Sequence, residues 1–168
     1  IRIPMIIRYP GRVRPGATSD EMVLNLDLAP TMLEVAGLPV PSDMQGRSIL
    51  PLAEGKFVKD WRKDWLYEFY EYPGFENVRP CRGVRTERYK LIHYFIEPEE
   101  WELDDLKTDP NEMDNLYGKT GYEEPTAHLK ERLEALRAET HDTFQYKPTG
   151  IPMHWGFGTT TESGLKQK

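Results

Sequence analysis

The fold is decided by the stretch Arg82-Gly83-Val84-Arg85-Thr86-Glu87-Arg88-Tyr89-Lys90-Leu91-Ile92. The stretch contains two short runs on either side of a tight turn near Thr86-Glu87. The first run covers residues 83–86, and the second covers residues 88–95 and so extends past the quoted stretch. Paired apolar runs around such a turn are typical of a β-hairpin. The chain is therefore expected to contain an antiparallel sheet.

Further elements flank this hairpin. Side chains alternate along residues 64–72 with the period of a half-buried strand, and residues 101–106 read as another strand. Residues 125–138 are predicted to form a helix with the proline at its first position. Its apolar stripe consists of Leu129, Leu133 and Leu136. We predict a small sheet of about four strands with this stripe packed on one face.

The residues before the sheet are predicted to form shorter elements. Residues 5–8 read as a buried strand and residues 21–26 as another. Asp27 stands where the N-cap of a following helix belongs, and Gly37 is a typical helix stop. The apolar residues on one face of that helix are Leu28, Met32, Val35 and Ala36. Residues 38–52 have loop composition, with too few apolar residues in period for a helix or a strand.

These elements suggest three parts: residues 1–55, the end of one domain; residues 56–145, a second subdomain; and residues 146–168, an extended tail. Residues 1–7 read like a strand entered from something upstream. We therefore expect the chain to be a piece of a longer protein.

Composition excludes some classes of function. Lys and Arg number 22 against 28 Asp and Glu, a formal charge of −6, so a nucleic-acid partner is not expected. No apolar run approaches the ~20 residues that span a bilayer. A single cysteine excludes an intrachain disulfide and leaves the compartment undecided.

Five stretches carry a resemblance to a known family. Three lie early in the chain: Ile3-Pro4-Met5-Ile6-Ile7-Arg8-Tyr9-Pro10-Gly11, Asn25-Leu26-Asp27-Leu28-Ala29-Pro30-Thr31-Met32-Leu33, and Met44-Gln45-Gly46-Arg47-Ser48-Ile49-Leu50. The other two are the hairpin stretch quoted above and Trp101-Glu102-Leu103-Asp104-Asp105-Leu106 with Asp109-Pro110-Asn111-Glu112. In this order, over about residues 1–137, they resemble the carboxyl-terminal part of the sulfatase family.

This resemblance implies a fold class and a chemistry. It implies the end of an α/β catalytic domain of the alkaline-phosphatase type, followed by an α+β subdomain. It also implies a formylglycine nucleophile, made within a C-x-[PA]-x-R motif, and a bound calcium, all supplied by residues upstream of this segment. The implied partners are that missing N-terminal catalytic domain and a sulfated sugar, and the implied location is periplasmic or secreted.

Cys81 and its neighbours resemble the nucleophile motif in spacing, because Cys81 and Arg85 stand four residues apart. Gly83 occupies the middle position, and the stretch aligns with a strand of the subdomain instead. We interpret Cys81 as a reduced, partly buried thiol. The segment is therefore expected to be noncatalytic and to hold no metal or other cofactor of its own.

Candidate substrate-binding residues lie around the hairpin. Arg82, Arg79 and Glu71 accompany aromatic residues that could form a rim where rings stack on sugar and arginines bind anionic oxygens. Aromatic packing at a sheet edge is the alternative. His93 lies in an apolar strand, where a structural histidine is the default and a substrate ligand the alternative.

An acidic cluster begins within the last predicted strand and continues beyond it. Its members are Asp104, Asp105, Asp109, Asn111, Glu112 and Asp114. The spacing departs from the calcium-binding EF-hand loop and lacks its glycine, so turn and capping roles are expected.

The resulting hypothesis is that the complete protein hydrolyses sulfate esters of carbohydrates, similar to enzymes acting on N-acetylglucosamine 6-sulfate, and that this segment shapes one wall of the pocket. Two alternatives stay open. One is a noncatalytic carbohydrate-binding or interaction module. The other is a phosphonate or phosphate ester hydrolase of the same superfamily.

Overall fold

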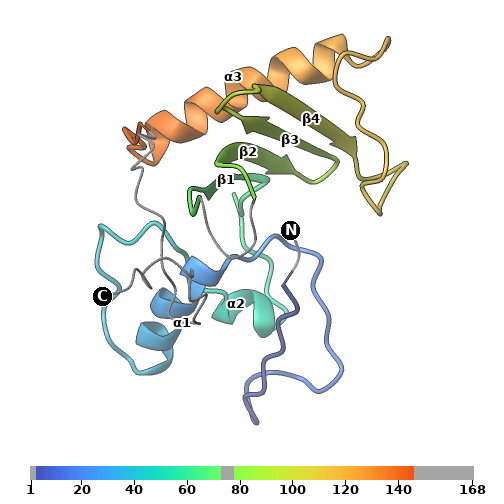
Figure 1. Ribbon diagram of the computed structural model, residues 1–168. Helices are drawn as coiled ribbons and strands as arrows, with labels where there is room; N and C mark the ends of the chain where they lie inside the picture. Colours follow the sequence, from blue (N-terminus) through green and yellow to red (C-terminus); the bar gives the residue numbers. More distant parts are fainter. Residues whose placement is uncertain (1–2, 73–77, 146–168) are drawn as a thin grey trace, which may run out of the picture. The chain divides into compact units, whose positions relative to one another are not determined.

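A computed structural model describes residues 3–72 and 78–145 (Figure 1). The described residues form two compact units, one over residues 3–65 and 138–140, the other over residues 66–72, 78–137 and 141–145. The predicted tail, residues 146–168, lies outside the described residues. Among the described helices, none has the length and apolar character needed to cross a membrane.

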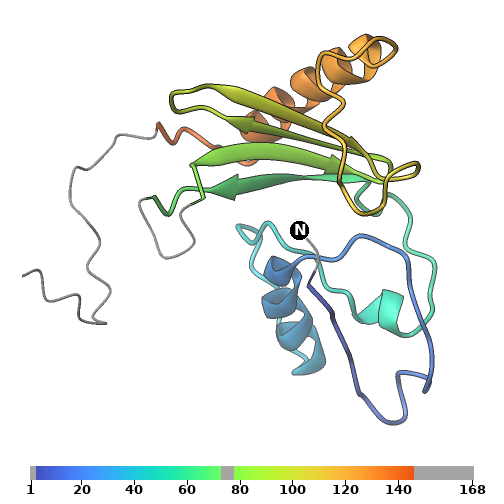
Figure 2. The same cartoon turned by 45° about the vertical axis from the view of Figure 1, so that its right-hand side comes forward.

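The predicted four-stranded sheet is confirmed. Its strands are β1 (Asp64–Phe69), β2 (Cys81–Thr86), β3 (Tyr89–Tyr94) and β4 (Glu100–Asp105), in the order β1-β2-β3-β4. The β2–β3 and β3–β4 pairs are antiparallel, and the arrows of β1 and β2 run in opposite directions in Figure 2. β1 ends three residues earlier than predicted, at Phe69.

The predicted leucine stripe also covers one face of this sheet. The helix α3 (Glu123–Glu139) runs along the sheet in Figure 1, and the core joins residues from both layers. These are Val84, Leu91, Leu103, Leu129, Leu133 and Leu136. Burying each leucine stabilises the fold by roughly 1.5–3 kcal/mol. The helix begins two residues before the predicted start, because a proline in the first turn removes only an N–H that has no intrahelical acceptor.

The first unit corrects several predictions. It contains the short 3-10 turn η1 (Asn25–Asp27), α1 (Leu28–Val35) and α2 (Leu50–Ala53). The strands predicted over residues 5–8 and 21–26 are wrong: those residues form no ladder, and the end of the second lies within η1. A strand requires a hydrogen-bonding neighbour, and the described residues provide none there. Residues 38–52 are not entirely loop, since the one-turn α2 begins within them.

Asp27 organises the first unit, although not as the predicted cap. It occupies the N-cap position of α1, yet its side chain makes no capping bond to that helix. The fully buried carboxylate instead accepts hydrogen bonds from the backbone N–H groups of Leu24 (2.7 Å) and Arg47 (2.8 Å). Arg62 pairs with both carboxylate oxygens, and its Nη2 lies 2.7 Å from Oδ1. Asp27 thus connects its own segment to the loop around Arg47 and to the segment around Arg62, and no sheet or helix joins these three segments.

Gly46 shows how closely those segments approach. A Cβ atom at this position would lie 2.1 Å from the carbonyl oxygen of Leu26. Only glycine therefore fits without a backbone shift.

Candidate functional site

The predicted site residues lie around one end of the sheet in the second unit. We call this place the rim and define it by Tyr70, Arg79, Arg82, His93, Phe95 and Phe144. Arg82 on β2 and His93 on β3 are cross-strand partners, so the hairpin places them side by side. Phe95 follows β3, and its ring centroid lies 6.1 Å from that of His93. The hairpin thus brings two of the four predicted site residues together.

Arg82 is the most connected residue of the rim. Its Nε donates to the hydroxyl of Tyr70 (2.8 Å) and lies 3.3 Å from Asp142 Oδ2, while Nη2 donates to the carbonyl of Phe144. The guanidinium carbon also stands 4.8 Å from the ring centroid of Phe95. The arginine side chain is only 12% exposed. The guanidinium therefore interacts mainly with other residues of the chain and little with solvent.

Asp142 supplies the counter-charge from the segment after α3. It lies 2.7 Å from Arg137 Nε and accepts the N–H of Phe144 (2.9 Å). Burial by itself would raise the pKa of Asp142. The hydrogen bonds from Arg137 and the Phe144 N–H, together with the charge of Arg82, outweigh burial and hold this pKa below its usual value. The carboxylate is thus ionised beside two arginines.

Tyr70 completes this arrangement. Its ring lies 4.3 Å from that of Phe144, and its hydroxyl donates to Glu68 (2.5 Å). Burial and the hydrogen bond to Glu68 raise the pKa of Tyr70, although Arg82 acts in the opposite direction. The phenol therefore stays neutral and can both donate and accept.

His93 is held by stacking. Its ring lies parallel to the indole of Trp101, with centroids 3.9 Å apart, and its Nε2 is 2.8 Å from Glu99 Oε1. Trp101 in turn stacks on Tyr117, and the ammonium of Lys130 lies 4.1 Å from the indole centroid. These contacts agree with a structural role and leave the predicted substrate contact untested.

The other two predicted residues stand apart from Arg82. Arg79 donates to the carbonyl of Pro98 and pairs with Glu100, and its guanidinium carbon lies 5.0 Å from the ring centroid of Tyr94. Glu71 follows β1 and is exposed. Within the described part of the chain, no direct hydrogen bond or ion pair joins Glu71 or Arg79 to Arg82.

Cys81 has the properties of a structural thiol. It is a free cysteine with only 2% of its surface exposed. Burial, helped by the nearby charge of Glu102, raises its pKa to about 11. A thiol that stays protonated at neutral pH is a poor nucleophile.

Sequence reasoning missed a buried lysine on the opposite face of the sheet. Lys90 is 5% exposed, and its Nζ lies 2.6 Å from Glu112, 2.9 Å from Asp104 and 3.4 Å from Glu102. The register of β3 and β4 explains this contact, because Lys90 lies directly opposite Asp104. Burial raises the pKa of Asp104, although Lys90 opposes that effect.

The acidic cluster after β4 therefore has structural tasks. Asp109 accepts the N–H groups of Met113 (2.6 Å) and Asp114 (2.9 Å), which confirms the predicted turn role. Of the other carboxylates in the cluster, Asp104 and Glu112 pair with Lys90, and Asp105 pairs with Arg88. Over residues 3–72 and 78–145 no three His, Cys, Asp or Glu side chains are arranged to hold a metal ion.

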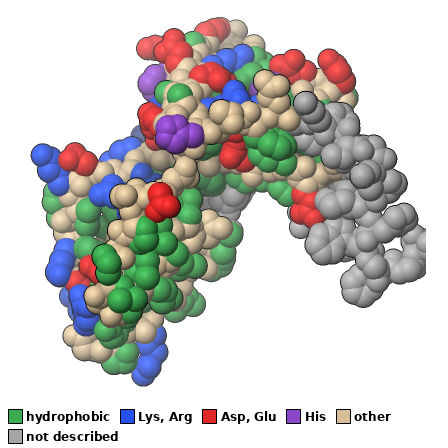
Figure 3. Space-filling model, turned by 90° about the vertical axis from the view of Figure 1, so that its left-hand side faces the viewer, with side chains coloured by type: hydrophobic (Ala, Val, Ile, Leu, Met, Phe, Trp, Pro, Cys, Tyr) green, Lys and Arg blue, Asp and Glu red, His purple; other side chains and the backbone are tan. Residues whose placement is uncertain are grey.

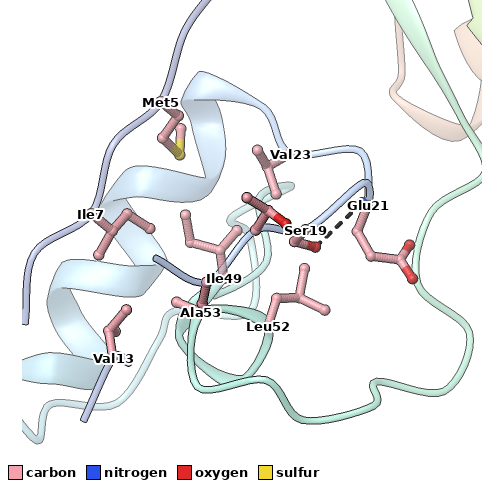
Figure 4. Close-up of a pocket in the computed structure, with 11 residues that line it drawn as sticks. Met5, Ile7, Val13, Ser19, Glu21, Val23, Ile49, Leu52 and Ala53 are labelled. Carbon is pink, nitrogen blue, oxygen red and sulfur yellow. Dashed lines mark hydrogen bonds between the residues drawn. The ribbon is translucent and has the colours of Figure 1, made fainter. Parts of the chain in front are cut away.

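The first unit has a separate hollow of about 270 Å³. Met5, Ile7, Val23, Ile49 and Leu52 are among the side chains that line it (Figure 4). Figure 3 shows hydrophobic side chains gathered over the same unit. The exposed members include Ile3, Ile6, Leu28, Met32, Val35 and Leu38. Several large apolar side chains of this unit are therefore exposed to solvent.

Several known proteins are similar to this chain in sequence. The family described as "N-sulphoglucosamine sulphohydrolase, C-terminal" matches residues 1–139. An N-acetylglucosamine-6-O-sulfatase of Bacteroides thetaiotaomicron is 44% identical over 143 residues, which are 84% of this chain and 26% of the relative. An ulvan-active sulfatase of Formosa agariphila is 30% identical over 91% of this chain and 36% of its own length. The chain thus spans about a quarter to a third of these relatives.

Solved structures agree with the sequence relatives. One protein, solved in complex with its substrate D-glucosamine-2-N,6-O-disulfate, matches with a TM-score of 0.77 and 43% identity, over 82% of this chain and 28% of that one. A phosphonate monoester hydrolase from Silicibacter pomeroyi has a TM-score of 0.67 at 22% identity, over 81% and 29%, and shares the fold. The sequence and structural matches together show that this chain belongs to the sulfatase C-terminal family.

Proposed function

We propose that this chain is the C-terminal part of a sulfatase that hydrolyses sulfate esters of carbohydrates, with the rim forming one wall of the substrate pocket. The carrying observation is the 44% identity to an N-acetylglucosamine-6-O-sulfatase over 84% of the chain. The structure bound to a sulfated glucosamine supports the same substrate class. In this proposal Glu71, Arg79, Arg82 and His93 contribute to the wall.

The chemistry in this proposal belongs to upstream residues. Cys81 is buried with a raised pKa, and the carboxylates of Asp104 and Glu112 pair with the ammonium of Lys90. The formylglycine, the calcium and the signal for export to the periplasm or medium are therefore assigned to the upstream part of the polypeptide. The present segment shapes the pocket and does not cleave the ester by itself.

Apolar exposure in the first unit supports packing against that upstream domain. Ile6 is 94% exposed and lies between Met5 and Ile7, which line the hollow, and Met32 on α1 is 64% exposed. Residues of this kind are normally covered in a stable protein.

The isolated chain is expected to bind a hydrophobic dye and to aggregate. The paired substitutions Ile6→Asp and Met32→Glu should reduce dye fluorescence markedly, because they place charge on this surface. Met113→Glu, at a residue that is 79% exposed in the second unit, is the matched control and should change little. A monodisperse wild-type chain with weak dye binding would contradict the assigned contact.

The proposed activity can be tested on the native polypeptide. Its mass and upstream peptides should reveal a chain several times larger that contains C-x-[PA]-x-R with an oxidised cysteine. The purified protein should release sulfate from D-glucosamine-2-N,6-O-disulfate. A native mass near the 19.6 kDa of this chain would instead favour a noncatalytic binding module.

A phosphoester or phosphonate substrate is the second candidate. A multifunctional alkaline phosphatase superfamily protein of Trinickia caryophylli is 36% identical over 72% of this chain and 26% of its own length. A phenyl phosphonate monoester in the same assay separates the two functions. Faster turnover of that ester than of any sulfate would replace the sulfatase proposal.

A further inference from the structure

We infer that Arg82 is a positioning residue, which holds Tyr70 and the segment after α3 in place so that the wall of the pocket keeps its shape. This inference rests on the proposed function. It differs from the prediction that Arg82 binds the substrate's sulfate directly. The distinction follows from where the donors of the guanidinium point.

Two nitrogens of the Arg82 guanidinium, Nε and Nη2, donate hydrogen bonds to other residues of the chain. An oxyanion is bound most strongly by two parallel N–H groups of a guanidinium. Nε of Arg82 already bonds to the Tyr70 hydroxyl at 2.8 Å, and Nη2 bonds to the carbonyl of Phe144. Both nitrogens of the Nε–Nη2 edge are therefore engaged. A sulfate could bind to this edge in the two-pronged manner only by displacing at least one of these contacts.

The face of the guanidinium is also covered. Its carbon lies 4.8 Å from the ring centroid of Phe95 and 5.5 Å from that of Tyr70. Only 12% of the Arg82 side chain is exposed to solvent. Its contacts are therefore directed toward other parts of the protein.

Those contacts join four segments of the second unit. They are the end of β1 through Tyr70, the start of β2 through Arg82, the end of β3 through Phe95, and the segment after α3 through Asp142 and Phe144. Asp142 extends the connection to α3, because it also pairs with Arg137 at 2.7 Å. Glu71 directly follows Tyr70, so its direction depends on how the tyrosine is held.

The test compares Arg82→Gln, Asp142→Asn and the double variant in the full polypeptide. Glu131→Gln is the control for charge, since it lies exposed on α3. Two substrates are used for steady-state kinetics: D-glucosamine-2-N,6-O-disulfate, which is large enough to touch the wall, and 4-nitrophenyl sulfate, which carries the same reacting group without the sugar. Circular dichroism ensures that every variant is folded at the assay temperature.

Positioning predicts a rise in KM for the sugar of roughly tenfold in Arg82→Gln and a similar rise in Asp142→Asn. The double variant should add little, because both single changes release the same contact. The kinetics of 4-nitrophenyl sulfate should be unchanged in all of them. Arg82→Lys should recover only part of the loss, since lysine cannot contact Tyr70 and Phe144 together with the geometry of a guanidinium.

Two kinetic outcomes would overturn the inference. Equal losses on both substrates in Arg82→Gln, with Asp142→Asn unaffected, would show direct contact with the sulfate. Unchanged kinetics on the sugar would show that the cluster supports folding alone. A wild-type protein inactive on both sulfates would instead refute the proposed function, and the melting temperatures of the four-protein cycle would still reveal whether Arg82 and Asp142 are coupled.

Discussion

Asp27→Ala is expected to lower the free energy of unfolding by about 3–5 kcal/mol, because removing one partner of a buried ion pair leaves the other charge uncompensated. Arg62 would keep its charge with only 12% of its side chain exposed. The backbone N–H groups of Leu24 and Arg47 would also lose their acceptor. Urea unfolding followed by tryptophan fluorescence measures this loss, since Trp61 packs beside Arg62.

Two further variants separate charge from packing. The pair Asp27→Leu with Arg62→Met should recover part of the stability, because neither charge is then left alone. Recovery should be incomplete, since the two N–H groups still lack an acceptor. Asp43→Ala, in an exposed loop of the same unit, should stay within about 0.5 kcal/mol of the wild type. A loss below about 1 kcal/mol for Asp27→Ala would show that this ion pair does not hold the unit together.

Lys90→Met is expected to destabilise the second unit by a similar amount, about 3–5 kcal/mol at neutral pH. Methionine is close to lysine in length, so the change removes the charge with little loss of volume. Glu102, Asp104 and Glu112 would then face one another without the ammonium that lies within 3.4 Å of each. The unpaired charge of Asp104 should destabilise the folded state most, because only 1% of its side chain is exposed.

This loss should depend on pH in a defined direction. Burial already raises the pKa of Asp104 in the folded protein, and the charge of Lys90 opposes that effect. Without Lys90 the folded-state pKa rises further above its value in the unfolded chain. A group of this kind contributes stability below its unfolded pKa and loses it as the pH rises through its folded pKa. The deficit of Lys90→Met should therefore be largest at neutral pH and shrink on acidification.

Urea unfolding at several pH values between about 5 and about 7.5 tests this direction, because ordinary carboxylates titrate near pH 4 and raised ones titrate higher. Lys119→Met removes an exposed lysine of the same unit and should cause little loss at any of these pH values. A deficit for Lys90→Met that is constant across the range would show that the carboxylates relax into solvent.

The sheet and its covering helix were predictable because local patterns determine them. Alternation along residues 64–72, the turn near Thr86 and the leucine stripe of α3 each depend only on neighbours in sequence. The two N-terminal strands failed for the opposite reason. Residues 5–8 have a suitable composition, but a strand exists only where another strand hydrogen bonds to it, and the described chain offers none.

Candidate site residues were identifiable as types, while their partners were not. The hairpin was predicted, and its register in the structure places Arg82 opposite His93. Nothing in the local pattern indicates that Arg82 meets Asp142, which lies 60 positions further along the chain. Asp27 likewise read as a helix cap because Arg62 lies 35 residues away.

By itself the sequence determined the family, the strands of the sheet and the helix face that covers it, because periodicity and ordered motifs are local properties. Tertiary structure alone decided which charges are buried together: Asp27 with Arg62, Lys90 with three carboxylates, and Arg82 with Asp142. The physical reason is that the energy of a charged side chain depends on the groups and the solvent around it, and those are set only when distant segments meet.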